Sequence, residues 1–147
     1  MNKLIFLFLI LCIFKSNAQC NLDLNTILKS INLNDSDFET YYLSKGYEYM
    51  PEVKKMICFD ENYNIANFIQ KSFSTYTIIN YSTISKSNYL ELKTDVVNLN
   101  FKYLKKEETE KSTSYFYLKD NILITLDTDF NSPDRVLYNL AITIITK

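Results

Sequence analysis

Two segments decide the fold, FETYYLSKGYEY (residues 38–49) and LKTDVVNLNFKY (residues 92–103), because both run through the same series of structural signals. An offset of 54 residues brings their apolar and helix-ending positions together. The aligned pairs are Phe38 with Leu92, Tyr42 with Val96, Leu43 with Val97, Gly46 with Asn100, Tyr47 with Phe101 and Tyr49 with Tyr103. Apolar residues at i, i+4 and i+5 in both segments predict the buried stripe of a helix.

The ends of the two predicted helices carry matching signals. Gly46, the only glycine, and Asn100 stand where each helix would stop, and both residue types tolerate the left-handed backbone conformation that closes a helix. Capping side chains precede both segments: Asp35 or Ser36 before the first, and Ser85 or Ser87 before the second. Residues 22–33 carry apolar side chains on one face and predict a further helix before the first copy.

After each helix the sequence alternates in the manner of β-strands. The predicted strands are residues 47–49, 56–59, 63–69 and 76–81, then 101–104, 115–118, 122–126 and 137–145. The repeated unit is a helix followed by about four antiparallel strands, in units 22–84 and 85–147, with chance agreement as the alternative to a true duplication. Either way the sequence predicts an α+β fold with an antiparallel β-sheet of about eight strands and two or three helices on one face.

The first eighteen residues have the pattern of a secretory signal peptide. Lys3 is followed by an apolar run over residues 4–14, and Ser16 and Ala18 place small residues at the two positions that a signal peptidase checks. Eleven apolar residues reach roughly 17 Å as a helix, whereas a hydrocarbon core is about 30 Å thick, so an uncleaved membrane anchor is disfavoured. We expect a mature chain of residues 19–147, one domain exported to the periplasm or secreted, with no transmembrane segment after cleavage.

Three cysteines become two once Cys12 leaves with residues 1–18. Cys20 and Cys58 are then the candidates for a disulfide, which an oxidising compartment permits. In the alternative, Cys58 is a buried apolar residue and Cys20 lies free at the new terminus. Lipid attachment at Cys20 is disfavoured, since Gln19 and Asn17 stand where lipoproteins place a small residue and a leucine.

The composition argues against several classes of function. Without residues 1–18 the chain has 14 basic and 17 acidic side chains and a single arginine, Arg135, so we expect no nucleic-acid partner. The chain has no histidine, which removes the commonest general base and zinc ligand. The adjacent carboxylates Asp60-Glu61 and Glu107-Glu108 are interpreted as solvated. We therefore expect no catalytic residues and no cofactor.

A calcium site is also disfavoured. Residues 127–131 have oxygen ligands at alternate positions, like the first half of an EF-hand loop. The second half of that pattern fails, because Ser132 and Tyr138 stand where the glycine and the bidentate glutamate are needed. A looser calcium loop that includes Asp134 is the alternative, but a polar connection between two strands explains the same residues, and we expect no metal site.

The free face of the sheet is the place for a function. Alternation in residues 115–118 puts Phe116 and Leu118 on one face and Tyr115 and Tyr117 on the other, and we expect the two tyrosines to form a protein-binding face. The alternative is that tyrosine simply favours strands. The leading hypothesis is an exported, non-catalytic module that binds a protein or an envelope component. A carrier of an apolar small molecule, or a histidine-free enzyme, is the alternative.

The tandem helix-and-meander arrangement resembles the architecture of proteinaceous β-lactamase inhibitors, whose broad sheet embraces an enzyme. The resemblance is one of topology, with no shared motif, and a fold does not fix a function. It therefore assigns no inhibitory activity to this chain.

Overall fold

The computed structural model describes residues 20–73, 75–132 and 135–145. The predicted signal peptide and the cleavage site before Gln19 lie outside the described residues. The helices are α2 (Leu24–Ser30), α3 (Asp35–Leu43) and α4 (Lys86–Asn98). The strands are β1 (Glu48–Met50), β2 (Lys55–Phe59), β3 (Ile65–Phe73), β4 (Thr77–Thr83), β5 (Lys102–Glu108), β6 (Ser112–Lys119), β7 (Ile122–Ser132) and β8 (Arg135–Ile144).

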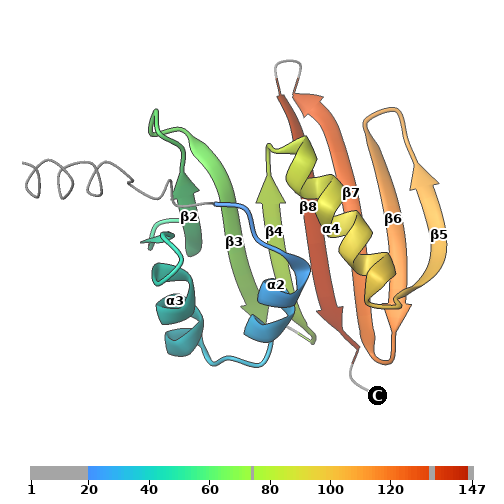
Figure 1. The fold of residues 1–147 in the computed structure, drawn as a ribbon, viewed down its shortest axis with the longest axis horizontal. Helices are drawn as coiled ribbons and strands as arrows, with labels where there is room; N and C mark the ends of the chain where they lie inside the picture. Colours follow the sequence, from blue (N-terminus) through green and yellow to red (C-terminus); the bar gives the residue numbers. More distant parts are fainter. Residues whose placement is uncertain (1–19, 74, 133–134, 146–147) are drawn as a thin grey trace, which may run out of the picture.

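These strands form one antiparallel sheet in the order β1-β2-β3-β4-β8-β7-β6-β5. Each half is a helix followed by four strands, and the two halves join where β4 pairs with β8. All three helices lie against the same face of the sheet (Figure 1). The predicted α+β fold, its eight strands and its helices on one face are confirmed.

The two longer helices end in the same way. Gly46 has φ 84° and Asn100 has φ 61°, so each adopts the left-handed conformation that the sequence predicted. The next amide then turns back onto the helix: the N–H of Tyr47 donates to the carbonyl of Tyr42, and the N–H of Phe101 to the carbonyl of Val96, both at 3.1 Å. The chain therefore enters β1 and β5 through equivalent turns.

The helix starts agree with the prediction in one case. Ser85 caps α4 by accepting a hydrogen bond from the N–H of Asn88 at 3.2 Å. The cap of α3 is Asn34, whose side-chain oxygen accepts from the N–H of Asp37 at 2.9 Å, rather than Asp35 or Ser36. Both cap residues have an extended backbone, as a helix cap requires.

The predicted buried stripe is correct at four positions and wrong at two. Phe38 and Tyr42 in α3, like Leu92 and Val96 in α4, are buried. The remaining pair, Leu43 and Val97, is 52% and 60% exposed. A residue five positions along a helix is rotated by about 140° from the first, which carries it out of the core-facing stripe.

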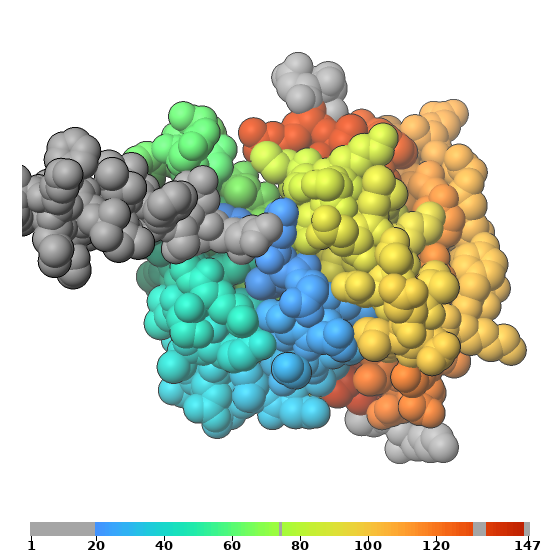
Figure 2. All heavy atoms as spheres, in the orientation of Figure 1, coloured from blue at the N-terminus to red at the C-terminus, as the bar shows by residue number. Residues whose placement is uncertain are grey.

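The core fills the space between the helices and the sheet. Figure 2 shows α2 lying between α3 and α4, so that the three helices form one continuous layer on this side. Beneath that layer, side chains such as Ile27, Ile69 and Leu140 are at most 1% exposed. Because the helices cover this face alone, the opposite face of the sheet is left without a cover among the described elements.

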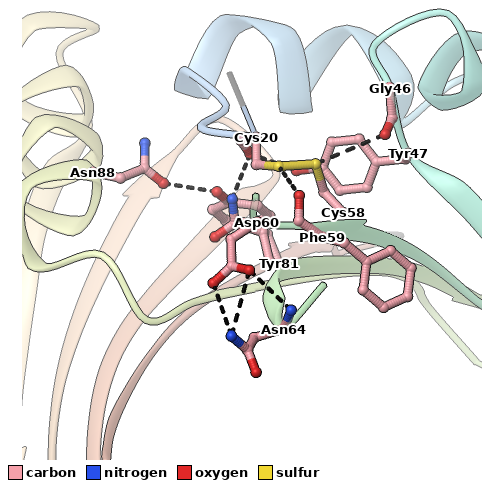
Figure 3. Close-up of a disulfide and its surroundings, with 10 residues drawn as sticks. Cys20, Gly46, Tyr47, Cys58, Phe59, Asp60, Asn64, Tyr81 and Asn88 are labelled. Carbon is pink, nitrogen blue, oxygen red and sulfur yellow. Dashed lines mark hydrogen bonds between the residues drawn. A yellow bond between two sulfur atoms is a disulfide. The ribbon is translucent and has the colours of Figure 1, made fainter. Parts of the chain in front are cut away.

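A disulfide, drawn in Figure 3, and three hydrogen bonds hold the first described residues in this core. Cys20 is bonded to Cys58 of β2, with their Cα atoms 5.8 Å apart, so the predicted disulfide is present. The Cys20 carbonyl accepts from the Tyr47 hydroxyl at 2.8 Å and from the Asn67 amide at 2.6 Å. The side-chain amide of Asn88 continues the network by donating to the Leu22 carbonyl at 3.1 Å. The side-chain oxygen of Asn88 accepts from the hydroxyl of Tyr81, a buried tyrosine of β4, at 2.7 Å.

Among the described residues, no helix combines the length and the apolar character needed to cross a membrane.

Candidate functional site: the open face of the sheet

The structure places Tyr115 and Tyr117 on the helix-covered face, so the expectation that they line the free face is not met. Tyr117 is 5% exposed and packs edge-on against Tyr103, with ring centroids 5.7 Å apart. Tyr115 is half-buried, and the ammonium of Lys93 from α4 lies 3.6 Å from its ring centroid. The alternation was predicted correctly, but the two faces were assigned the wrong way round. Phe116 therefore lies on the free face.

We call the surface without helices the open face. One row of cross-strand neighbours runs across it through all eight strands. In strand order the row is Glu48, Ile57, Phe68, Ser82, Asn139, Asp127, Ser114 and Glu107. Its first half is apolar at β2 and β3, whereas its second half is polar at β8, β7 and β6. Along this row the two halves of the sheet thus offer different chemistry, although Phe116 and Leu118 add apolar side chains to the open face at β6.

The apolar half contains a groove of about 270 Å³, which we call the open-face groove. Seven of its ten lining residues are apolar: Val53, Ile57, Ile65, Ala66, Phe68, Ile84 and Leu137. The other three are Lys55, Ser82 and Arg135. Strand pairing assembles the floor, because Ile57 lies opposite Phe68 and Phe68 lies opposite Ser82. Four strands, β2, β3, β4 and β8, therefore contribute to one concave apolar site.

Both charged side chains among the described lining residues are cations. The Lys55 ammonium lies 4.0 Å from the centroid of the Phe68 ring, in a cation–π contact. Arg135 is exposed at the start of β8. In the described part of the chain the ion pairs are Lys105–Glu107 and Lys106–Glu108, both within β5, so neither groove cation has a carboxylate partner there.

Asp60, a carboxylate on which the charge of Arg135 acts, is hydrogen-bonded within its own turn. Asp60 closes the β2–β3 connection by accepting from the N–H groups of Asn62 and Asn64 at 2.8 and 2.9 Å. These bonds, Asn64 first, hold the pKa of Asp60 below its usual value, and the charge of Arg135 adds to the effect. Asp60 does not line the groove, so the groove keeps its positive character.

The polar half of the open face is a hydrogen-bonded row. The Ser82 hydroxyl donates to the Asn139 side-chain oxygen at 2.6 Å, across the junction between β4 and β8. Burial raises the pKa of the neighbouring Asp127 carboxyl; the hydrogen bond from Ser114 opposes that rise and the charge of Asp129 adds to it. Among the described residues of this half, the hydroxyls of Ser82 and Ser114 thus already have side-chain hydrogen-bond partners, in Asn139 and Asp127.

The calcium-loop pattern named from the sequence falls only in part on described residues, because the side chains of residues 131–134 lie outside them. Asp127 and Asp129 lie within the strand β7 rather than in a loop. Over residues 20–73, 75–132 and 135–145, no group of three or more Asp, Glu, Cys or His side chains is arranged to hold a metal ion. Glu107 and Glu108 are exposed and paired with lysines, as expected for solvated side chains.

A smaller cavity of about 150 Å³ lies on the helix side, between α3 and the strands β1 to β3. Lys71 reaches into it and donates a hydrogen bond to the Leu33 carbonyl. Its ammonium also lies 4.7 Å from the Phe73 ring and 6.0 Å from the Phe38 ring. Burial lowers the pKa of Lys71, and the charge of Asp35 opposes that shift. Because the lysine already has these partners, the cavity is best explained as packing around the loop between α2 and α3.

Comparisons with protein-family models, curated proteins and solved structures find no match to this chain, so its topological resemblance to β-lactamase inhibitors stands without a matching relative, and the site must be interpreted from its own geometry.

Proposed function

We propose that this protein is an exported, non-catalytic binding module that docks another protein or an envelope component on its open face. The observation that carries the proposal is the open-face groove, an apolar depression on the side of the sheet that no described helix covers. Strongly apolar concave patches on otherwise polar surfaces mark interaction sites. The disulfide supports the export part of the proposal, because such bonds persist in oxidising compartments.

The size of the groove favours an anchor point for a partner's side chains. Small-molecule sites usually enclose about 300 to 1,000 Å³ and bury most of the ligand. The open-face groove, at about 270 Å³, lies just below that range and is open along the sheet. It matches the central pocket of a protein interface, where one or two apolar side chains contribute most of the binding energy.

A carrier of an apolar small molecule is the second candidate, because the same groove could hold a short apolar chain. The two candidates differ in what would lie next to the Phe68 ring. In a docking module it is a partner protein, whereas in a carrier it is a molecule of low mass.

Site-specific photo-crosslinking separates these cases. A benzophenone amino acid placed at Phe68 should crosslink to a protein in envelope extracts, and excess unmodified protein should suppress the product. The matched control is the same group at Val97, an exposed apolar position on α4 at the opposite side of the molecule. Equal products at both positions, or none at Phe68, would contradict docking through the open face. A small adduct at Phe68, without a protein product, would instead support the carrier.

Export has its own measurement. Expression of the full chain in a bacterial host, followed by mass analysis of the exported fraction, should give a product that begins at Gln19. Retention of residues 1–18 in the exported form would contradict the expected cleavage.

A further inference from the structure

We propose that the open-face groove selects acidic partner segments, in which an apolar side chain is flanked by carboxylates. This inference rests on the proposed docking function and names the chemistry of the partner. It is carried by charge complementarity, because the described lining of the groove has an apolar floor and two cations but no carboxylate.

The two cations lie on opposite sides of the apolar floor. Lys55 belongs to β2 and Arg135 to β8, and β3 and β4 lie between those strands. A side chain seated on the apolar floor would therefore lie between Lys55, at the Phe68 ring, and Arg135. A partner segment with carboxylates before and after its apolar residue could pair with both cations. A segment without carboxylates would leave both cations without a partner.

Neither cation forms an ion pair with a carboxylate within the described part of the chain. The ammonium of Lys55 lies over the Phe68 ring, an interaction that positions the charge at the groove without using its hydrogen-bond donors in a salt bridge. Arg135 offers a planar guanidinium suited to bidentate contact with a carboxylate. Asp60 is already held by the amides of its own turn and lies outside the lining.

Three small probes of nearly equal shape test whether the groove prefers a negatively charged ligand: 3-phenylpropionate, 3-phenylpropan-1-ol and 3-phenylpropan-1-amine. Binding is followed by amide shifts of isotope-labelled protein at Ala66, Ser82 and Leu137. We expect the acid to bind at least about threefold more tightly than the alcohol, and the amine to bind most weakly. The preference for the acid should shrink as salt rises from about 0.05 to about 0.5 M. Equal affinities, or shifts confined to other residues, would overturn the proposal.

Charge-removing variants assign the preference to the two cations. Lys55→Gln combined with Arg135→Gln should lower the affinity for 3-phenylpropionate to that of the alcohol while leaving the affinity for the alcohol unchanged. The matched control is Lys93→Gln on α4, whose ammonium also lies over an aromatic ring but on the helix side. The proposal fails if the control weakens the acid as much as the double variant does.

A second set of probes distinguishes a protein segment from a free acid. A hexapeptide with Phe flanked by Asp should compete with 3-phenylpropionate, and the same peptide with Lys flanks should not. Decanoate binding about tenfold more tightly than the acidic peptide would overturn the assignment to a partner segment, a difference of about 1.4 kcal/mol.

The two proposals can fail separately. A protein crosslink at Phe68 without any charge preference among the probes would refute the selection of acidic segments and leave the docking function standing. A clear preference for the acid without a protein crosslink would refute docking and leave a groove for small acids.

Discussion

Reduction of the Cys20–Cys58 disulfide should lower the free energy of unfolding by about 4 kcal/mol. The two cysteines are 38 residues apart in the sequence. On the chain-entropy model, cross-linking a loop of this length restricts the unfolded chain by about 13 cal/mol/K, or roughly 4 kcal/mol at 25 °C. The native contacts of the segment should survive reduction, because the Cys20 carbonyl keeps its bonds to Tyr47 and Asn67 and Leu22 stays buried.

Urea unfolding of oxidised and reduced protein, followed by circular dichroism, measures this difference. With a slope of about 2 kcal/mol/M, the midpoint should fall by about 2 M on reduction. A double variant, Cys20→Ala with Cys58→Ala, should unfold like the reduced protein and should not respond to reductant. Coincident midpoints for the oxidised and reduced forms would refute the reasoning. A loss far above 4 kcal/mol would show instead that the segment leaves the core once the bond is broken.

Three other predictions concern buried groups on each face of the sheet. Burial raises the pKa of Tyr42, Tyr47 and Tyr81, that of Tyr81 to about 12. The contribution of the three neutral phenols to the free energy of unfolding is therefore fully present below about pH 10, the pKa of an unfolded tyrosine, and should fall by about 4 kcal/mol per pH unit above it. Phenolate absorbance and circular dichroism should therefore change together in alkali. Because burial raises the pKa of Asp127, its ionisation destabilises the fold as the pH rises; Asp127→Asn should raise the melting temperature at pH 7 but not at about pH 3. Tyr117→Ala should lower the free energy of unfolding in urea by about 3 to 5 kcal/mol, and a loss below about 1 kcal/mol would contradict its core position.

The order of elements could be predicted from the sequence because its signals are local. A helix ends where Gly46 or Asn100 adopts a left-handed backbone, whatever lies elsewhere in the molecule. Alternation marks a strand in the same way, and turn residues set its limits. These signals needed no knowledge of which strands pair, so eight strands and their succession followed from them.

The faces could not be assigned so securely, because burial depends on partners distant in sequence. In residues 115–118 both alternating sets are apolar, so the pattern gives no reason to prefer either one for the core. The pairing decides: Tyr117 lies opposite Ile124 and Tyr103, under the helix layer, and Phe116 faces away. The run over β2 held the missed signal for the groove, because apolar side chains at both alternating positions, Ile57 as well as Met56, place apolar surface on both faces of the sheet.

The groove arises from the way in which the two halves of the sheet differ. Counting outward from the β4–β8 junction, the second and third strands contribute Phe68 and Ile57 on one side and Asp127 and Ser114 on the other. One architecture thus supports an apolar anchor in its first half and a half-buried carboxylate in its second. A partner that follows this row across the face must therefore be asymmetric, with apolar and acidic groups over Ile57 and Phe68 and hydrogen-bonding groups over Asp127 and Ser114. Because the helix-and-meander plan is the same in both halves, the side chains of the open face, rather than the fold, determine which partner can bind.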